Sequence, residues 1–290
     1  MRAKEKILDQ FPALSPTLRA AARFIVDHPN DVVISSMRTL AEHAKAQPST
    51  LVRLAQQLGF SGWPELKSAF AEDLGLRREG YGERAKNLTT RGKTADLVGE
   101  LFSAQQANLV LTEALCASAL KDAAKALKKS RSVHVAGFRA SFPVAYALVY
   151  GYRLFRDSVH LIDGQGGGLE MQMRSISKQD VVVAISFAPY SRESLAVVEA
   201  ARTAGAKIIA LTDSNASPLA LASDVPVLFS ATSPSFFPSV AAAVAVTEAL
   251  LELLVADAGE GIVKKIDQTE QSLFESGAYL QAPTRRTPIR

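Results

Sequence analysis

Two short polar stretches in the second half of the chain combine guanidinium and hydroxyl side chains. Residues 137–141 hold Arg139 and Ser141, and residues 186–193 hold further hydroxyls and charges. A guanidinium group forms paired, charge-assisted hydrogen bonds to a carboxylate or a phosphate. The two stretches therefore indicate a site for a small anion that carries a phosphate or a carboxylate. The candidate effector-binding residues are Arg139, Ser141, Ser186, Tyr190, Ser191, Arg192 and Glu193.

The elements around these stretches predict a parallel sheet. Apolar segments that suit buried strands alternate with helical segments, a pattern typical of a sheet covered on both faces. Ligands bind such sheets where the strands end at their carboxyl edge. We therefore expect the loops 137–141, 163–168 and 186–193 to form one site, the glycine-rich second loop allowing close backbone approach. The predicted strands are 133–137, 159–162, 181–186, 207–211 and 225–229, and the predicted helices are 94–129, 142–155, 191–204 and 238–256.

Two simpler interpretations of the polar residues stay open. Arg139 and Arg192 could be solvated side chains at helix starts, although an arginine there opposes the helix dipole unless an acid or a ligand accompanies it. Alternatively, Glu193 or Glu248 could act as a catalytic base. A lone carboxylate without an oriented partner is a weak candidate for catalysis, and the four histidines lie outside the three loops.

No residue pattern indicates a cofactor or a metal. The chain has a single cysteine, Cys116, which excludes an intrachain disulfide and a multi-cysteine metal site. We expect no catalytic residues, no cofactor and no metal.

A second candidate site lies near the N-terminus, on a helix predicted for residues 49–58. Its apolar positions form one stripe, which leaves hydroxyl, arginine and amide side chains on the other face. Such side chains contact base edges and phosphates of duplex DNA, whereas the simpler interpretation is an ordinary amphipathic surface helix. The candidate DNA-binding residues are Ser49, Thr50, Arg53, Gln56 and Gln57.

Two further helices precede this one. Ser15-Pro16 starts the first, which ends near His28-Pro29, and a short second helix covers about residues 36–44. Residues 45–48 then make a tight connection to the third helix, as in a helix-turn-helix motif. We expect Phe60 and Trp63, which follow, to be core residues.

Length and charge fit two domains joined by a basic linker. The chain has 290 residues, 48% of them hydrophobic, and a net charge of +4; residues 76–93 alone hold six Lys or Arg against two Asp or Glu. The expected fold is an all-α helix-turn-helix domain (1–75), a basic linker (76–93), a three-layer α/β domain with a parallel sheet (94–258), and a C-terminal helix with a basic tail (259–290). No apolar run is long enough to span a bilayer, so we expect a cytoplasmic protein with no membrane partner.

Both halves resemble known families. Residues 14–74, with "LSPTLRAAARFIVDHP" and "STLVRLAQQLGFSGWPELK", resemble the DNA-binding domain of RpiR-family regulators. Residues 94–258, with "GAKIIALTD" and "SPLALASD", resemble the SIS (sugar isomerase) domain. The loops depart from the usual SIS pattern: Arg139 replaces a glycine, and Ala188-Pro189 replaces a serine and a glycine. The connection at residues 45–49 also departs from the RpiR pattern.

The resemblance implies a transcription regulator that binds a double-stranded DNA operator and senses a phosphorylated sugar or sugar acid. We expect a homodimer or homotetramer, assembled through residues 94–129 and 238–256, whose effector acts on DNA binding through the linker. The alternatives are a sugar-phosphate isomerase and a sugar-sensing regulatory protein that does not bind DNA.

Overall fold

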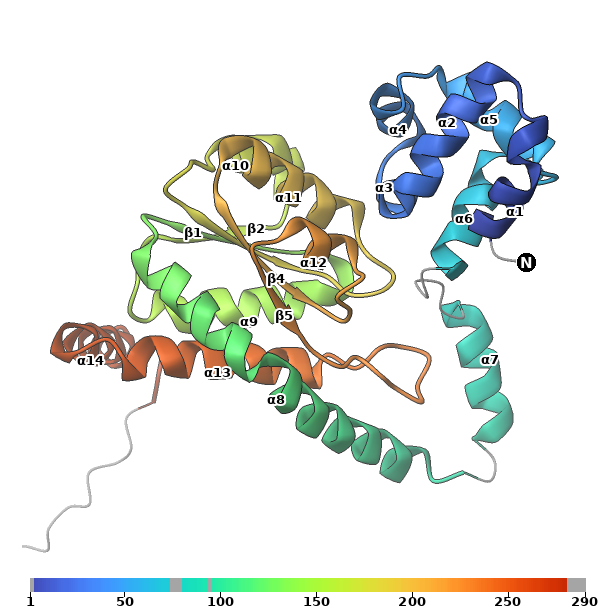
Figure 1. The fold of residues 1–290 in the computed structure, drawn as a ribbon. Helices are drawn as coiled ribbons and strands as arrows, with labels where there is room; N and C mark the ends of the chain where they lie inside the picture. The colour runs from blue at the N-terminus through green and yellow to red at the C-terminus, as the bar shows by residue number, and fades with distance from the viewer. Residues whose placement is uncertain (1–2, 74–79, 93–94, 281–290) are drawn as a thin grey trace, which may run out of the picture.

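The computed structural model describes residues 3–73, 80–92 and 95–280, which form a helical domain, a single linker helix and an α/β domain (Figure 1). Among these residues, no helix combines the length and the apolar character needed to cross a membrane. The prediction of an all-α domain followed by an α/β domain with a parallel sheet is confirmed.

The N-terminal domain packs six helices around one apolar core. The Ser15 hydroxyl accepts a hydrogen bond from the Leu18 amide and so caps the second helix, as predicted. Pro29 was expected only to end this helix, but it also begins a further short helix, because proline is favoured in the first helical turn. The helices are α1 (Ala3–Gln10), α2 (Pro16–Asp27), α3 (Pro29–Ile34), α4 (Met37–His43), α5 (Pro48–Gln57) and α6 (Trp63–Asp73), with a 3-10 turn, η1 (Phe11–Ala13).

The linker contains a helix that the sequence analysis did not predict. Helix α7 (Tyr81–Arg91) has no buried residue and takes up most of the predicted linker, of which residues 76–79 and 93 lie outside the described part. Figure 1 shows α7 between the helical domain and the α/β domain. The linker is therefore a structural element with a defined face.

The α/β domain is a three-layer structure around a five-stranded parallel sheet with the order β2-β1-β3-β4-β5. The central strand β3 is buried along its whole length, which explains its apolar sequence VVVAI. Every predicted strand is present, with ends within one residue of the prediction. The strands are β1 (Val133–Gly137), β2 (Val159–Ile162), β3 (Val181–Ile185), β4 (Lys207–Thr212) and β5 (Val225–Leu228).

Helices cover both faces of the sheet (Figure 1). One apolar cluster joins the sheet to α8, α9 and α13, and a second joins the opposite face to α10, α11 and α12. The predicted helix 238–256 starts three residues later than expected. The bounds are α8 (Leu97–Lys129), α9 (Phe142–Arg153), α10 (Leu169–Arg174), α11 (Arg192–Ala204), α12 (Pro218–Ala222) and α13 (Ala241–Ala256), with the 3-10 turns η2 (Arg139–Ser141) and η3 (Gln165–Gly167).

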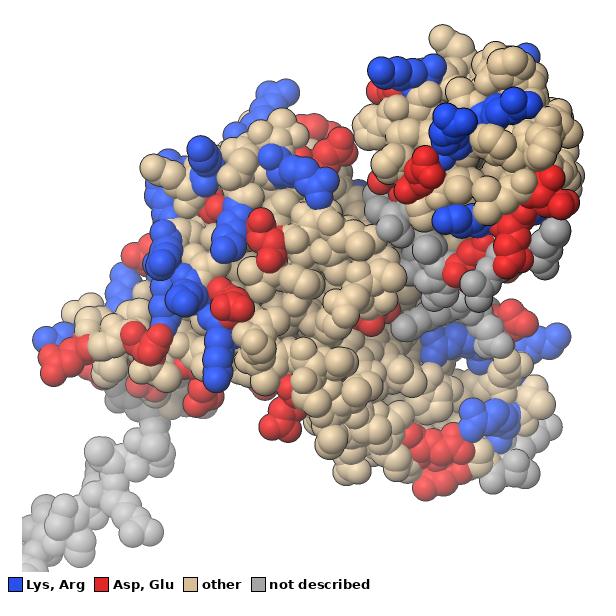
Figure 2. All heavy atoms as spheres, in the orientation of Figure 1, with Lys and Arg blue, Asp and Glu red and all other residues tan. Residues whose placement is uncertain are grey.

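Two helices extend beyond this core. The amino-terminal half of α8 projects past the sheet toward α7, and α14 (Glu260–Glu275) follows α13 (Figure 1). The predicted basic tail at residues 281–290 lies outside the described residues. Figure 2 shows Lys and Arg gathered where α8 ends and β1 begins, so positive charge is not confined to the linker.

Candidate DNA-binding surface and effector site

Helix α5 carries the candidate DNA-binding residues, and four of the five are exposed. Ser49, Arg53, Gln56 and Gln57 face solvent. The prediction that Thr50 shares this face is wrong: Thr50 is only 2% exposed, because it lies on the side of α5 that packs into the domain. The exposed surface thus offers one guanidinium, two amides and one hydroxyl.

Packing fixes the orientation of α5. Leu51, Leu54 and Leu58 are fully buried and hold the helix against its neighbours. The turn before it is closed by a hydrogen bond from the Ala46 amide to the Ala41 carbonyl, 2.8 Å long, and Lys45 adopts a left-handed conformation with φ 50°. Helices α4 and α5 with this turn form the predicted helix-turn-helix. Trp63 is buried, as expected for a core residue.

In the α/β domain, the first ligand loop turns sharply after β1. A Cβ atom on Gly137 would lie 2.6 Å from the Ala145 Cβ and 2.8 Å from the Ser141 carbonyl oxygen, so only glycine fits. Arg139 has φ 53°, a conformation that glycine adopts more easily than other residues. The backbone thus keeps the geometry of a glycine turn although the residue is arginine.

The loop after β3 is held together by its own hydroxyls. The Ser186 hydroxyl accepts a hydrogen bond from the Ser191 amide at 3.2 Å, and the Ser191 hydroxyl accepts one from the Ser194 amide at 3.1 Å. Ser191 is therefore the N-cap of α11. Both serines are buried, so in this state their hydroxyls serve the loop itself.

Asp213 is a residue of this loop cluster that the sequence analysis missed. It directly follows β4, and its carboxylate accepts hydrogen bonds from the Tyr190 hydroxyl at 2.8 Å and from the Ala188 amide at 3.3 Å. The signal that could have identified it is a carboxylate placed just after a buried strand at the same sheet edge. Asp213 ties the β3 loop to the neighbouring strand.

Arg139 and Glu193 link the first loop to the start of α11. The Arg139 guanidinium donates to Glu193 Oε1 at 2.6 Å, with the two side chains 73% and 30% exposed. The hydrogen bond from Arg139 is the main cause that lowers the pKa of the Glu193 carboxyl, and the same bond raises the pKa of Arg139. Arg139 is thus a largely exposed side chain that has an acid partner. Arg192 is exposed.

The glycine-rich loop after β2 is held by hydrogen bonds between its own backbone and nearby side chains. The Asp163 carboxylate accepts from the Gln165 amide and from the Gln172 side chain, both at 3.1 Å, while Gln172 accepts from the Gly164 amide. Cβ atoms at Gly166 and Gly167 would meet nothing within 4 Å, so this backbone is open to solvent.

The loop after β5, residues 229–240, connects the sheet edge to the linker. Asn108 and Thr112 of α8 are buried and hold it: Asn108 donates to the Thr232 carbonyl at 2.7 Å, and Thr112 accepts from the Ser230 amide at 2.9 Å. On its other side, the Arg84 guanidinium of α7 donates to the Ser233 carbonyl at 2.7 Å.

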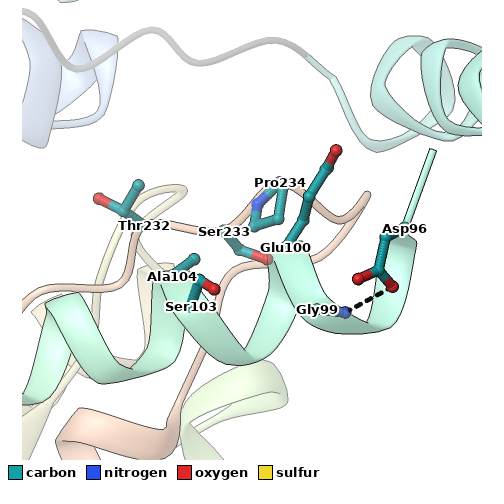
Figure 3. Close-up of a pocket in the computed structure, with 8 residues that line it drawn as sticks. All are labelled: Asp96, Gly99, Glu100, Ser103, Ala104, Thr232, Ser233 and Pro234. Atoms are coloured by element: carbon teal, nitrogen blue, oxygen red, sulfur yellow. Dashed lines mark hydrogen bonds between the residues drawn. The ribbon is translucent and has the colours of Figure 1, made fainter.

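Two further contacts hold α7 in place. The rings of Tyr81 and Phe237 lie 5.5 Å apart, and Arg91 forms an ion pair with Glu100 of α8. An open hollow of about 700 Å³ lies between the start of α8 and this loop, and Figure 3 shows the side chains that line it. The residues that line it are Asp96, Gly99, Glu100, Ser103, Ala104, Thr232, Ser233 and Pro234.

The two histidines of the α/β domain lie in strands rather than in the three loops. His134 and His160 are strand residues, as predicted, and their rings are 5.3 Å apart. Burial lowers the pKa of His134, an effect that the nearby Asp180 carboxylate partly opposes. Asp180 is buried and bonded to Arg131. Glu248 is exposed on α13.

The fold joins a helix-turn-helix domain to an α/β domain with a five-stranded parallel sheet. Comparison with known proteins agrees with this architecture. The helix-turn-helix domain of the RpiR family matches residues 1–76, and the SIS domain matches residues 126–253. The two matches identify an RpiR-type helix-turn-helix domain and a SIS domain in this chain.

Individual relatives include both regulators and a larger protein. The regulator HexR of Escherichia coli is 26% identical over 78% of this chain and 79% of its own length. The bifunctional protein glk of Burkholderia mallei is 31% identical over 74% of this chain, which spans only about a third of that protein. The structure of Vibrio vulnificus NanR in complex with ManNAc-6P has the same fold, with a TM-score of 0.59, 20% identity, and coverage of 96% of this chain and all of NanR.

Proposed function

We propose that the chain regulates transcription by binding duplex DNA through α5, and that a small sugar-derived anion in the SIS domain changes this binding. Ser49, Arg53, Gln56 and Gln57 are the proposed DNA contacts. They are exposed on the second helix of the helix-turn-helix, which in this class of motif enters the major groove. Thr50 is left out of this set because it is buried.

The proposed effector site is the carboxyl edge of the sheet. It comprises the first-loop residues Arg139 and Ser141 and the residues around the start of α11, namely Ser186, Tyr190, Ser191, Arg192 and Glu193. The two exposed guanidinium groups favour a phosphate or a carboxylate on the ligand. NanR, which shares this fold, was solved with a sugar phosphate, and this supports the same ligand class here.

The contact between α7 and the loop after β5 is the observation that carries this proposal. It links the ligand-binding sheet edge to the linker that leads to the DNA-binding domain, through the hydrogen bond from Arg84 to Ser233. A ligand that binds one position of this loop more tightly than another would shift the equilibrium between arrangements of the DNA-binding domains. The free energy of that shift can be no larger than the difference between the two binding free energies.

A homodimer would present two such domains to a palindromic operator. The amino-terminal half of α8 favours this assembly, since Val98, Phe102 and Leu109 are exposed at spacings that place them on one helix face. Helix α13 is largely covered by α8 and α9 of its own subunit. We therefore propose α8 as the main dimer contact.

An isomerase is the second candidate, because the SIS domain also occurs in sugar-phosphate isomerases. We propose that this chain is not an enzyme: both histidines of the α/β domain lie in strands away from the loops, and Glu193 is bonded to Arg139. The test is a thermal-shift screen of sugar phosphates and sugar acids, followed by an isomerase assay on each stabilising compound. Stabilisation without turnover is the expected result, since a ligand that binds the native state raises its melting temperature.

A further inference from the structure

The ion pair between Arg139 and Glu193 closes the space between two of the proposed ligand loops. Arg139 comes from the turn after β1, and Glu193 lies in the first turn of α11, 54 residues later in the chain. An anion that binds the same guanidinium nitrogen, Arg139 Nη2, must therefore compete with a carboxylate that already holds it.

Glu193 also occupies the position that an anion would take at the start of α11. The amides in the first turn of a helix attract negative charge. Here the backbone of Glu193 itself helps to lower the pKa of its own carboxyl, and the Ser194 amide bonds to the Ser191 hydroxyl. The Ser194 amide is thus satisfied by the protein itself.

Two features of the ion pair between Arg139 and Glu193 favour its separation by a ligand. Glu193 Oε2 is buried, and among the described residues it has no hydrogen-bond partner, which is a cost in a folded protein. The pair is also partly exposed, and ion pairs in such surroundings are weak.

We propose that Glu193 is an internal competitor, whose carboxylate holds Arg139 and the start of α11 until the anionic group of the effector displaces it. This inference rests on the proposed function, because it concerns the same effector site. It changes the role of Glu193 from a ligand contact to a specificity-determining residue. A neutral sugar offers no charge that can replace the carboxylate, so the pair selects for ligands with an anionic group.

The test compares the full-length chain with two glutamine variants. Glu193→Gln keeps the size of the side chain and removes its charge. Glu199→Gln makes the same change on an exposed residue of the same helix and serves as the control. Binding of inorganic phosphate and of glucose 6-phosphate is measured by calorimetry at fixed ionic strength, with potassium chloride as the reference titration.

The proposal predicts that Glu193→Gln binds both probes roughly two- to fivefold more tightly than wild type, the range expected when a weak competing ion pair is removed. Glu199→Gln should bind like wild type. In an Arg139→Gln background, the gain from Glu193→Gln should disappear, because no guanidinium remains to be released.

The outcomes separate this inference from the proposed function. Unchanged or weaker binding by Glu193→Gln, with clear binding by wild type, overturns the competitor role and leaves the anion site standing. Binding of neither probe to wild type or to any variant overturns both. A gain of the same size in Glu199→Gln would show a general charge effect and would also overturn the proposal.

Discussion

The Arg84 guanidinium of the linker helix donates a hydrogen bond of 2.7 Å to the Ser233 carbonyl, in the loop that follows the last strand of the sheet. This bond joins two segments that are 149 residues apart in the chain. It gives the linker a direct contact with the edge of the sheet that carries the ligand loops.

The first prediction concerns coupling. Arg84→Ala should leave effector affinity nearly unchanged but reduce the effect of the effector on DNA affinity by about tenfold or more, the value of one lost hydrogen bond to a charged group. The measurement is the DNA dissociation constant with and without a stabilising compound. Lys86→Ala, which removes an exposed charge from the same helix, should keep the wild-type ratio. Equal behaviour of the two variants would exclude this contact as the coupling element.

The second prediction concerns DNA binding. Arg53→Ala should weaken binding to a selected duplex by about tenfold, because an arginine in the groove contributes one strong contact to a base or a phosphate. If the contact is to a phosphate, the slope of log K against log salt should fall by about one. The control is Arg23→Ala, an exposed arginine on α2. A loss in Arg23→Ala as large as that in Arg53→Ala would argue against α5 as the recognition helix.

The third prediction concerns the β3 loop. Asp213→Ala should lower the free energy of unfolding by about 1–3 kcal/mol, since it leaves the Tyr190 hydroxyl and the Ala188 amide without this acceptor. Tyr190→Phe removes only one of these bonds and should cost about 1 kcal/mol. Denaturant titration measures both, and Tyr146→Phe, on an exposed ring, should be close to neutral. Equal stability of Asp213→Ala and wild type would contradict the role given to this carboxylate.

The fourth prediction concerns pH. Burial lowers the pKa of His134 in the folded state, so the unfolded state binds more protons as the pH falls. The stability that neutral His134 contributes is present above its ordinary pKa of about 6.5 and is lost as the pH falls toward the lower folded value. His134→Gln should flatten the decline in unfolding free energy between about pH 7 and about pH 5. His160→Gln should keep most of this decline in unfolding free energy, because burial of His134 itself is the main cause of its lowered pKa. A steeper decline in His134→Gln than in wild type would contradict the assignment of this pH dependence to His134.

The fifth prediction concerns assembly. Replacing Phe102 and Leu109 with glutamate should convert a dimer into a monomer, because both side chains are exposed on one apolar face of α8. Light scattering after size-exclusion chromatography gives the mass of each species. Met171→Glu, an exposed apolar residue on α10, should leave the assembly state unchanged. A dimer that survives the double substitution would place the interface elsewhere.

Periodicity in the sequence was sufficient for the strands and most helices, because buried strands and amphipathic helices leave regular apolar patterns. It failed at Thr50, whose burial depends on how closely the other helices pack around α5. Helix α7 was missed because its sequence is charged and begins after a glycine, and its contacts are with a distant loop.

The sequence predicted which polar residues lie at the carboxyl edge of the sheet, but it did not predict the bonds between them. The sequence places Arg139 and Glu193 at the same sheet edge, yet their pairing depends on the turn geometry after β1. Asp213 could be recognised as a partner of Tyr190 only once β3 and β4 were known to be neighbours in the sheet.

The most direct test of the central claim is the DNA affinity of the full-length chain in the presence and absence of a sugar phosphate or sugar acid. A duplex selected from random sequences and labelled for fluorescence anisotropy provides the probe. We expect tight, salt-dependent binding, and a change of about fivefold or more with at least one compound that also stabilises the protein. Failure to bind any duplex at low ionic strength, or an affinity that no stabilising compound changes, would contradict the account.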